Sequence, residues 1–392
     1  MKLLLCHNYY QQRGGEDQSF ELERDLLESR GHSVISFTVH NNTIPQMSRA
    51  TLLAKTIWNR SVYVKLRSLI RQHRPDVMHC TNLFPLISPA ASSAALTEQV
   101  PVVQSLRNYR MFCSNALFLR EGKVCEDCLG RTIPWPAIRH KCYRDSRTAS
   151  AVVVGLQTIQ KVTRSWNHID LFFTPSEFAR NKMIEGGLSP EQLAVKPNFL
   201  DPEPGVGSGS GDYVIYVGRL SPEKGISTLL EAWKHDPDLP KLMIVGNGPE
   251  KKTIQTAQES DQRIQLMGQL PLERALDLIG ESQCLVMPSI WYETFGRTVI
   301  EAYAKGAPVV ASRIGALTEL VEGHETGLLF EPGNSNSLSA SIKNLLDNPL
   351  RMTQMRKNAR DLYKRNFTAE RNYLMLMRLY STAIQRHSRR AS

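Results

Sequence analysis

The chain has 392 residues, of which 41% are apolar and 22% are charged, and its net charge is +10. This composition excludes a disordered chain, and no apolar run approaches the roughly 18–20 residues that cross a bilayer. The length exceeds one ordinary core, so we expect two domains of about 150–200 residues each. The opening stretch MKLLLCHNYY has too few consecutive apolar residues for a secretory signal core, which predicts a cytoplasmic protein.

The first half alternates strand-like and helix-like segments. A loop containing Gly14 and Gly15 follows the first strand pattern, and the run EDQSFELERDLLESRG after it has the spacing of a helix. The predicted strands are KLLLCH, SVISFTV, DVMHC, VPVVQSL and DLFFTPS. Strands that alternate with helices are typical of a doubly wound parallel sheet.

Positive charge is concentrated in the first half. Residues 1–200 contain 25 Lys and Arg against 16 Asp and Glu, and no acidic residue lies between Glu28 and Asp76. Residues 48–74 repeat apolar positions at helical spacing, which predicts a basic amphipathic helix suited to an anionic membrane surface. The alternative is a core-packing helix with a basic solvated face. Because no stacking aromatics interleave with the charges, we expect no nucleic-acid partner.

The second half repeats the alternating pattern after a stretch rich in Pro, Gly and Ser. We expect a first domain at 1–198 with a Cys-rich insert at 107–147, and a linker at 199–211. A second domain follows at 212–370, and a helix with a basic tail at 371–392 crosses back to the first domain. The predicted strands are YVIYVGRL, KLMIVG, RIQLMG, CLVMPS and APVVAS. Two such domains bind ligand in the cleft at the carboxyl ends of their strands.

Two glutamates, Glu293 and Glu301, flank the predicted start of a helix closed by Gly306. With Thr294 as N-cap, free backbone N–H groups at the helix start can hold a phosphate, which Gly296 allows to approach closely. Side chains on a helix lean toward its N-terminus, so the two carboxylates can bracket a pyrophosphate. These N–H groups belong to Phe295, Gly296, Arg297 and Thr298.

Cations and glycine turns precede this stretch. The segment VGRLSPEKG places Gly218, Arg219 and Lys224 directly after a strand, and fixed cations stabilise a departing phosphate. The segment VGNGPE places Gly246 in a second strand-to-helix turn. An Asp-Pro-Asp sequence at 236–238 is predicted to be a turn rather than a metal site.

Four cysteines form a separate pattern with the spacing C-x11-C-x2-C-x13-C. Cys125 and Cys128 form one C-x2-C pair, and the segment between Cys113 and Cys125 has the pattern of a hairpin. A reduced cytoplasm argues against disulfides. The pattern of Cys113, Cys125, Cys128 and Cys142 predicts a structural zinc site, with unmetallated packing thiols as the alternative.

These motifs resemble family 4 of the retaining glycosyltransferases, also called glycosyl transferases group 1. The resemblance rests on ETFGRTVIE, VGRLSPEKG, VGNGP, MGQLP and GHETGLLFEPGN in the second half. GGED, NYRMFCSNALFLREGKVCEDC and TPSEFARNKMIEGG match acceptor-side domains of the same family, so the resemblance covers almost the whole chain.

The resemblance implies an α/β protein with the GT-B fold, in which two Rossmann-like domains face each other across a cleft. It also implies transfer of a sugar, with retention and no catalytic metal, from a UDP- or GDP-sugar to a glycan or lipid-linked glycan acceptor in surface-polysaccharide assembly. Contact with the inner face of an anionic membrane would accompany this role. The alternatives are a catalytically weak or silent nucleotide-sugar-binding subunit and a GT-B sugar-nucleotide epimerase.

The resemblance also implies residue roles. Glu293 would hold the transferred sugar, Glu301 the ribose, and Arg219 and Lys224 the pyrophosphate. Gly14 and Gly15 would close over the phosphates, and backbone groups near Gly268 would frame the base. The chain departs from the family at Arg107, where a histidine is usual, so we expect Arg107 to contact a phosphate instead.

Overall fold

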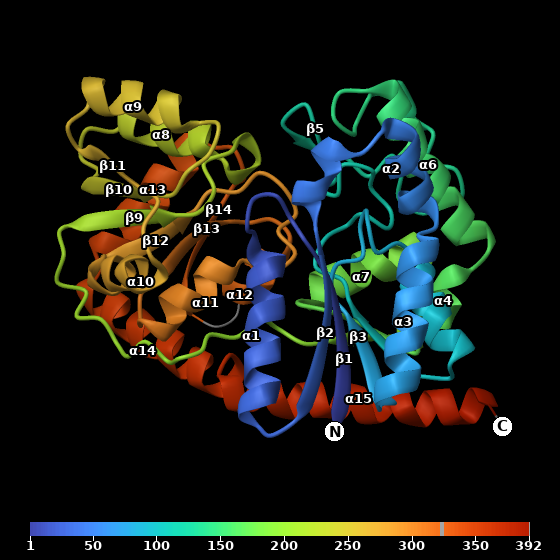
Figure 1. Cartoon of the computed structure of the whole chain (residues 1–392). Coiled ribbons are helices and arrows are strands. Elements are labelled where there is room, and N and C mark those ends of the chain that lie inside the picture. Colours follow the sequence, from blue (N-terminus) through green and yellow to red (C-terminus); the bar gives the residue numbers. More distant parts are fainter. Residues whose placement is uncertain (322–324, 392) are drawn as a thin grey trace.

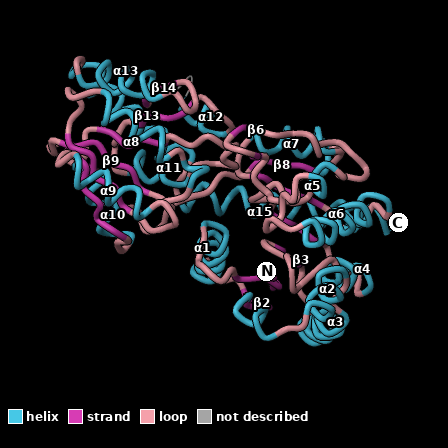
Figure 2. The backbone as a smooth tube through the Cα atoms, turned by 90° about the horizontal axis from the view of Figure 1, so that it is seen from above, coloured by secondary structure: helices cyan, strands magenta, loops and turns pink. Residues whose placement is uncertain are grey.

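The computed structural model describes residues 1–321 and 325–391 and contains two parallel sheets that lie beside each other (Figure 1). Residues 323–324 of the motif GHETGLLFEPGN lie outside the described residues, as does Ser392 at the end of the basic tail. The two sheets belong to the two halves of the chain, and the view from above separates these halves clearly (Figure 2). The chain is therefore an α/β protein with two Rossmann-like units.

The first sheet has six parallel strands in the order β2-β1-β3-β4-β7-β8. Its central strands are buried runs of apolar residues, as expected for a parallel sheet covered on both faces. Leu3 of β1 pairs with Val34 of β2 and with Val77 of β3. The strands are β1 (Lys2–Tyr9), β2 (Ser33–His40), β3 (Val77–Cys80), β4 (Val102–Ser105), β7 (Leu171–Thr174) and β8 (Leu193–Val195).

Helices cover both faces of this sheet. Leu3 and Leu5 face one core, which α1 and α15 complete, whereas Leu4 and Cys6 face a second core completed by α3, α4 and α7. The helices are α1 (Gly15–Ser29), α2 (Arg49–Ile57), α3 (Arg60–His73), α4 (Ala90–Thr97), α5 (Pro136–Arg139), α6 (Arg147–Val162) and α7 (Glu177–Gly186), with the 3₁₀ turns η1 (Asn41–Gln46), η2 (Ser165–His168) and η3 (Pro190–Gln192).

The second sheet also has six parallel strands, in the order β11-β10-β9-β12-β13-β14. Alternate residues of β9 again point to opposite faces of the sheet. Ile215 packs in the core on one face, and Val214 and Tyr216 pack in the core on the other. The strands are β9 (Tyr213–Val217), β10 (Lys241–Val245), β11 (Ile264–Gly268), β12 (Cys284–Met287), β13 (Val309–Ser312) and β14 (Gly327–Phe330).

The helices of the second half divide between its two faces. Helices α10, α11 and α14 cover one face, while α8, α9 and α13 cover the other. The elements are η4 (Pro222–Lys224), α8 (Ile226–His235), α9 (Lys251–Ser260), α10 (Leu272–Glu281), α11 (Arg297–Ala304), α12 (Ala316–Val321), α13 (Ser335–Leu346), α14 (Pro349–Asn366) and α15 (Ala369–Ala391).

The last helix, α15, returns to the first sheet. Leu376 and Tyr380 pack against Leu3, Val77 and Phe173, and the helix runs beneath the first half in Figure 1. The chain thus crosses between its halves twice, once near residue 200 and once near 367, where Leu200 bridges to Thr368. The limits of the two domains and of the linker stay predictions.

The strand predictions are confirmed, as are the turn at 236–238 and the hairpin formed by β5 (Leu119–Arg120) and β6 (Lys123–Val124). The prediction of one helix over 48–74 is wrong, because the segment forms the two helices α2 and α3. Trp58 is extended, and Asn59 caps α3 by accepting the N–H of Val62 at 3.3 Å. The side-chain amide of Asn59 also donates to the carbonyl of Leu86 at 2.6 Å, which fixes the break.

Candidate functional site

The carboxylate of Glu293 lies in the loop after β12 and receives three donors on one oxygen. Its Oε1 accepts from Lys224 Nζ at 2.5 Å, Ser289 Oγ at 2.7 Å and Trp291 Nε1 at 3.0 Å. Among the described residues no donor contacts the other oxygen, Oε2. Glu293 is buried, and its position is therefore fixed through one oxygen while the second is available to a ligand hydroxyl.

Lys224 ends the 3₁₀ turn η4, and the structure brings its ammonium to Glu293 across the carboxyl ends of β9 and β12. The same ammonium lies 5.2 Å from the ring centre of Trp291. Arg219 precedes it in the turn, where its carbonyl accepts from the hydroxyl of Tyr216 at 2.8 Å. Of the two predicted cations, Lys224 therefore contacts Glu293, whereas the side chain of Arg219 is exposed and its contact with a phosphate stays a prediction.

Helix α11 begins at Arg297, two residues later than an N-cap at Thr294 predicts. Gly296 is the N-cap, with a φ of +96°, and a side chain at this position would also clash with Leu317. Thr294 is not the N-cap; its hydroxyl donates to the carbonyl of Arg107 at 3.1 Å, across the two halves. Phe295 packs in the core against Phe367, so its side chain faces away from any ligand.

Arg297 and Glu301 form a buried pair at the start of α11. Arg297 Nε lies 3.2 Å from Glu301 Oε1, and the two terminal guanidinium nitrogens are buried with no partner among the described residues. Burial lowers the pKa of Arg297, Glu301 raises it, and the nearby charges of Arg107 and Arg13 lower it. A buried guanidinium with two unsatisfied nitrogens is a strong site for an anion.

Backbone hydrogen bonds join three predicted glycine turns. The N–H of Gly218 donates to Val245 O at 3.0 Å, and the N–H of Gly246 donates to Gly268 O at 2.8 Å. Gly246 has a φ of +147°, and a Cβ there would lie 1.9 Å from Gly218 O. Only glycine permits this contact, so the backbone can hold the ends of β9, β10 and β11 close together.

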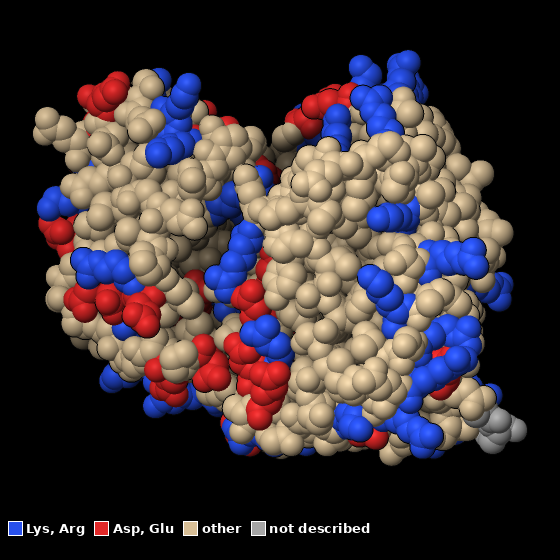
Figure 3. Space-filling view, in the orientation of Figure 1, with Lys and Arg blue, Asp and Glu red and all other residues tan. Residues whose placement is uncertain are grey.

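The glycine loop of the first half lies at the start of α1. A side chain at Gly14 or Gly15 would meet no protein atom within 4 Å, so both residues border open space. Gly14 donates its N–H to Asp17 at 3.0 Å, which caps the helix. Arg13 lies directly before this loop, and its positive charge lowers the pKa of Arg297 in the other half. Figure 3 shows a hollow between the two halves with Lys and Arg side chains at its edge.

The Arg107 side chain is held inside the first half. Its guanidinium donates to Glu23 Oε1 at 2.7 Å and to Asn198, and Lys196 Nζ lies 2.6 Å from the same Glu23 oxygen. Burial alone would raise the pKa of Glu23, but Lys196, Arg107 and His79 lower it to about 2. A phosphate contact would require Arg107 to leave this network, and the contact stays a prediction.

Two further contacts join the halves near this point. Ser176 Oγ donates to Thr294 O at 2.7 Å, and Glu319 accepts the N–H groups of Glu177 and Phe178 at 3.1 and 2.9 Å. A carboxylate at the start of α7 is stabilised by the helix dipole. The loop that carries Glu293 is therefore anchored against the first half.

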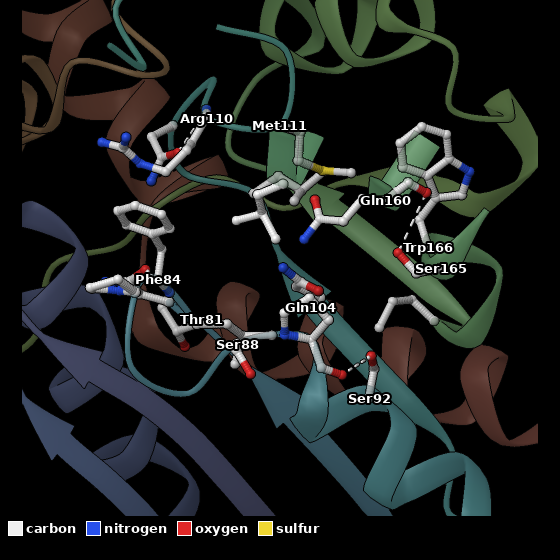
Figure 4. A pocket seen from close by; sticks show the side chains of 18 of the residues that line it. Thr81, Phe84, Ser88, Ser92, Gln104, Arg110, Met111, Gln160, Ser165 and Trp166 are labelled. Atoms are coloured by element: carbon white, nitrogen blue, oxygen red, sulfur yellow. Dashed lines mark hydrogen bonds between the residues drawn. The ribbon is translucent and has the colours of Figure 1, made fainter. Parts of the chain in front are cut away.

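The first half also contains a cavity of about 130 Å³ at the carboxyl ends of β3 and β4 (Figure 4). One end borders Glu16, Arg107 and Asn108 beside the cleft, and the other lies between α4, α6 and η2. No short motif encodes this cavity, so the sequence does not predict it. Its lining includes Thr56, Thr81, Phe84, Ser92, Gln104, Ser105, Arg110, Met111, Leu156, Gln160, Trp166 and Phe172.

The four cysteines of the insert line one small cavity, but the prediction of a zinc site is not supported. Among residues 1–321 and 325–391, no group of three or more His, Cys, Asp or Glu side chains is arranged to hold a metal ion. Two thiols instead donate hydrogen bonds, Cys113 to Asn115 at 2.9 Å and Cys128 to the carbonyl of Pro134 at 3.7 Å. Burial raises the pKa of Cys128 to about 12, which favours the neutral thiol that makes such bonds.

The sequence analysis also missed Arg13, Ser289 and Trp291. Ser289 and Trp291 could have been found from their position, because they lie within four residues of Glu293 in the same loop. The sequence around Arg13 contains no functional motif, apart from the two glycines that follow it. No helix within the described part of the chain has the length and apolar character needed to span a membrane.

Family models match both halves of the chain. Residues 4–198 match the glycosyl transferase 4-like domain, and residues 206–362 match glycosyl transferases group 1. The chain is 23% identical over 358 residues to an uncharacterized 42.6 kDa protein in the cps region of Klebsiella pneumoniae, covering 82% of this chain and 87% of the relative. It is 30% identical to an MMP α-(1→4)-mannosyltransferase of Mycolicibacterium hassiacum, over 55% of each chain.

Solved structures have the same fold. Anabaena HepE in complex with UDP superposes with a TM-score of 0.69 at 19% identity, covering 97% of this chain and 100% of that chain. Sucrose-phosphate synthase from Thermosynechococcus elongatus gives a TM-score of 0.70 at 18% identity, covering 97% and 98%. Since the two family models together account for most of the chain and the fold agrees, the chain belongs to the group 1 glycosyltransferases and has the GT-B fold.

Proposed function

We propose that the protein is a retaining glycosyltransferase that uses a UDP- or GDP-sugar. The observation that carries the proposal is the start of α11, where the part-buried Arg297 is paired with Glu301 and has two buried, unpartnered guanidinium nitrogens, four residues after Glu293 in the sequence. A pyrophosphate there would satisfy the guanidinium, Glu293 Oε2 would accept from the sugar hydroxyls, and Glu301 would accept from the ribose. UDP in the complex of Anabaena HepE supports this class of donor.

In the proposed reaction, the nucleoside diphosphate leaves from the face that the acceptor attacks. The bond between the anomeric carbon and the phosphate oxygen breaks, the acceptor oxygen bonds to that carbon, and the hydroxyl proton passes to the leaving phosphate. Arg219, Lys224 and Arg297 would stabilise the developing negative charge. This scheme assigns no step to a metal ion, and catalysis is proposed to need no cofactor.

A screen of nucleotides tests the donor assignment. UDP, GDP and ADP, each with and without a sugar, would be added to the protein and the melting temperature measured. We expect a concentration-dependent rise with UDP or GDP and a larger rise with one of their sugars. A protein stabilised by none of these ligands would contradict the proposal, because the Arg297 site would then not be an anion site for the donor.

The acceptor is proposed to be a glycan or lipid-linked glycan of a surface polysaccharide. Relatives from a cps region and from teichuronic acid biosynthesis support this class. Neither a silent donor-binding subunit nor a sugar-nucleotide epimerase is favoured, because both halves match glycosyltransferase families and the pairs Lys224–Glu293 and Arg297–Glu301 are intact. Transfer to an acceptor, measured as release of nucleoside diphosphate together with a new glycoside, distinguishes the three roles.

We further propose that α2 and the start of α3 contact the inner face of an anionic membrane. Leu53, Ile57 and Trp58 expose 38%, 37% and 44% of their surface, beside Lys55 and Arg60. Apolar side chains that alternate with cations suit such a surface. Cosedimentation with liposomes containing phosphatidylglycerol should occur at low salt and weaken at high salt, whereas a protein that stays in the supernatant at low salt would contradict the proposal.

A further inference from the structure

Tyr292 lies directly before Glu293 and packs against both halves of the chain. Its side chain contacts the core between the second sheet and α10, α11 and α14, and also the core that α3, α4 and α7 complete in the first half. Among the residues that the structure describes, no other side chain packs against a core of each half. Tyr292 therefore ties the loop that carries Glu293 to the opposite side of the cleft.

The first half surrounds the ring of Tyr292 with two aromatic rings and an ion pair. The ring centres of Phe178 and Phe118 lie 4.8 and 6.3 Å from its own, and both rings meet it edge to face. Lys182 Nζ lies 5.6 Å from the centre of the Tyr292 ring and pairs with Glu126 at 2.9 Å. These are favourable arrangements for an aromatic ring, so the four side chains form a socket for Tyr292.

Half of this socket comes from the Cys-rich insert, to which the proposed reaction assigns no role. Phe118 lies between Cys113 and Cys125, and Glu126 follows Cys125 directly. The N–H of Cys125 donates to the carbonyl of Phe118 at 2.8 Å, and Phe118 is buried. The insert is therefore fixed where it meets the loop of the other half, and α7 supplies the remaining two side chains.

Glu293 depends on its backbone for orientation, because its three donors all bind Oε1. The carboxylate can still turn about this oxygen, so the direction of Oε2 follows the position of the loop. Gly315 lies behind the loop, where a Cβ would come within 3.1 Å of the Cα of Tyr292. Adjacent residues share a planar peptide unit, so a shift of Tyr292 toward an emptied socket would move Glu293 with it.

We propose that Tyr292 is a positioning residue, through which the insert and α7 direct Glu293 Oε2 toward the transferred sugar. Tyr292 acts through Glu293 and does not itself contact the donor. The nucleotide is held separately, at Arg297 and Glu301. This inference rests on the proposed function, because it concerns the sugar contact of the same site.

The variant Tyr292→Ala tests this role with two related ligands. The probes are the one among UDP-glucose, UDP-galactose, UDP-N-acetylglucosamine and GDP-mannose that most raises the melting temperature of the wild type, and its nucleoside diphosphate. The Kd for the nucleoside diphosphate should stay within about twofold, whereas the Kd for the nucleotide sugar should rise roughly fivefold through loss of the contact with Glu293. Calorimetry measures both, and equal changes or no change would overturn the inference.

Hydrolysis of the same nucleotide sugar gives a second readout. The bond between the anomeric carbon and the phosphate oxygen breaks, a water oxygen bonds to that carbon, and a water proton passes to the leaving phosphate. We expect kcat to fall roughly tenfold or more in Tyr292→Ala, because a small displacement of a positioning group is costly. Tyr292→Phe keeps the ring and should retain at least about a third of the wild-type kcat. An equal loss in both variants, or none in Tyr292→Ala, would overturn the role of the ring.

Tyr373→Ala is the matched control. Tyr373 is also half-buried, with Arg30 at 5.2 Å and the ring of His32 at 5.7 Å from its ring centre. It lies on α15 beside the start of β2, at the end of the first sheet away from the cleft. Both Kd values and kcat should equal those of the wild type. A loss of kcat in Tyr373→Ala as large as in Tyr292→Ala would reflect stability alone and overturn the inference.

Two variants of the first half test the socket itself. Phe178→Ala and Phe118→Leu leave the second half unchanged, yet each should raise the Kd for the nucleotide sugar roughly threefold. Combined with Tyr292→Ala, each should add less than its separate effect, since the residues are in contact. Full additivity would overturn the coupling between the halves, and an unchanged Kd in Phe118→Leu would overturn the role of the insert.

The wild type separates this failure from failure of the proposed function. A wild type that binds and hydrolyses a nucleotide sugar, with Tyr292→Ala equal to it, overturns the positioning role alone. A wild type that neither binds nor hydrolyses any of the four nucleotide sugars overturns the proposed function.

Discussion

The two sides of the cleft differ in how they are built. The second half concentrates charge in two short loops, with Lys224, Glu293, Arg297 and Glu301 in direct pairs. The cavity of the first half is lined mainly by hydroxyls, carboxamides and apolar side chains from residue 56 to residue 172. The proposed donor is anionic and would be held by fixed charges, whereas the cavity of the first half offers mainly neutral polar and apolar groups. The two halves therefore offer a ligand different physical means of recognition.

Among the variants considered, the one that removes the Lys224 side chain should have the largest effect on the rate of transfer. In Lys224→Ala, Glu293 loses a charged partner and the leaving phosphate loses a cation, so we expect the rate of transfer to fall by roughly 10²–10³. Initial rates at saturating donor and acceptor measure this. Lys234→Ala, an exposed lysine at the end of α8, is the matched control and should behave as the wild type. Near-normal turnover in Lys224→Ala would remove this cation from the mechanism.

The ribose contact should show as a loss of donor affinity. Glu301→Gln keeps the size of the side chain and removes its charge, which weakens a charge-assisted hydrogen bond by about 1.5–3 kcal/mol. We expect the Kd for the nucleoside diphosphate to rise roughly 10–100-fold, as measured by calorimetry. Because Arg297 keeps a hydrogen bond but loses its charged partner, the melting temperature without ligand should also fall, so donor affinity is measured below the unfolding temperature of the variant. An unchanged Kd would place the ribose elsewhere.

Much of the second half could be predicted from its sequence, and less of the first. Strands such as YVIYV and KLMIV are continuous apolar runs, and the residues around Glu293 form short motifs. The start of α11 was misplaced because the left-handed φ of Gly296 moves it to Arg297. The cavity of the first half could not be predicted, since its lining comes from segments that only the tertiary fold brings together. The cysteine spacing predicted a zinc site; the four cysteines do line one cavity, but among the described residues they are not arranged to hold a metal ion.

A substitution of Arg107, in the first half, tests whether this side chain supports the fold or contacts the donor. If its role is to hold Glu23, Arg107→His should destabilise the protein by about 1–3 kcal/mol, because a buried carboxylate loses one of its charged donors while Lys196 remains. Urea unfolding measures this. The Kd values for UDP- and GDP-sugars should stay within about twofold of the wild type. A change in the preferred donor would instead show that Arg107 contacts the donor.

The smallest expected effect is a pH dependence of stability. Burial lowers the pKa of His79 to about 4, an effect that Lys196 and Arg107 add to and Glu23 opposes. Between an unfolded pKa of about 6.5 and this folded value, only the unfolded chain takes up the proton, so stability falls as pH falls. From pH 7.5 to 5.5 this loss is roughly 1 kcal/mol for His79.

Below this range the low pKa of Glu23 acts in the same direction, because the unfolded chain binds its proton first. Urea unfolding at pH 7.5 and 5.5 would compare the wild type with His79→Gln, which cannot titrate. A smaller loss in His79→Gln is expected. Equal losses in the two proteins would show that His79 does not lie in a charge-excluding environment.

The most direct test of the account is to measure the KM for the nucleotide sugar and the KM for a glycan acceptor in the wild type and in Glu301→Gln. We expect Glu301→Gln to raise the donor KM roughly tenfold or more and to leave the acceptor KM within about twofold. A result in which Glu301→Gln changes both KM values equally, or leaves the donor KM unchanged, would contradict the assignment of the charged second half to the donor.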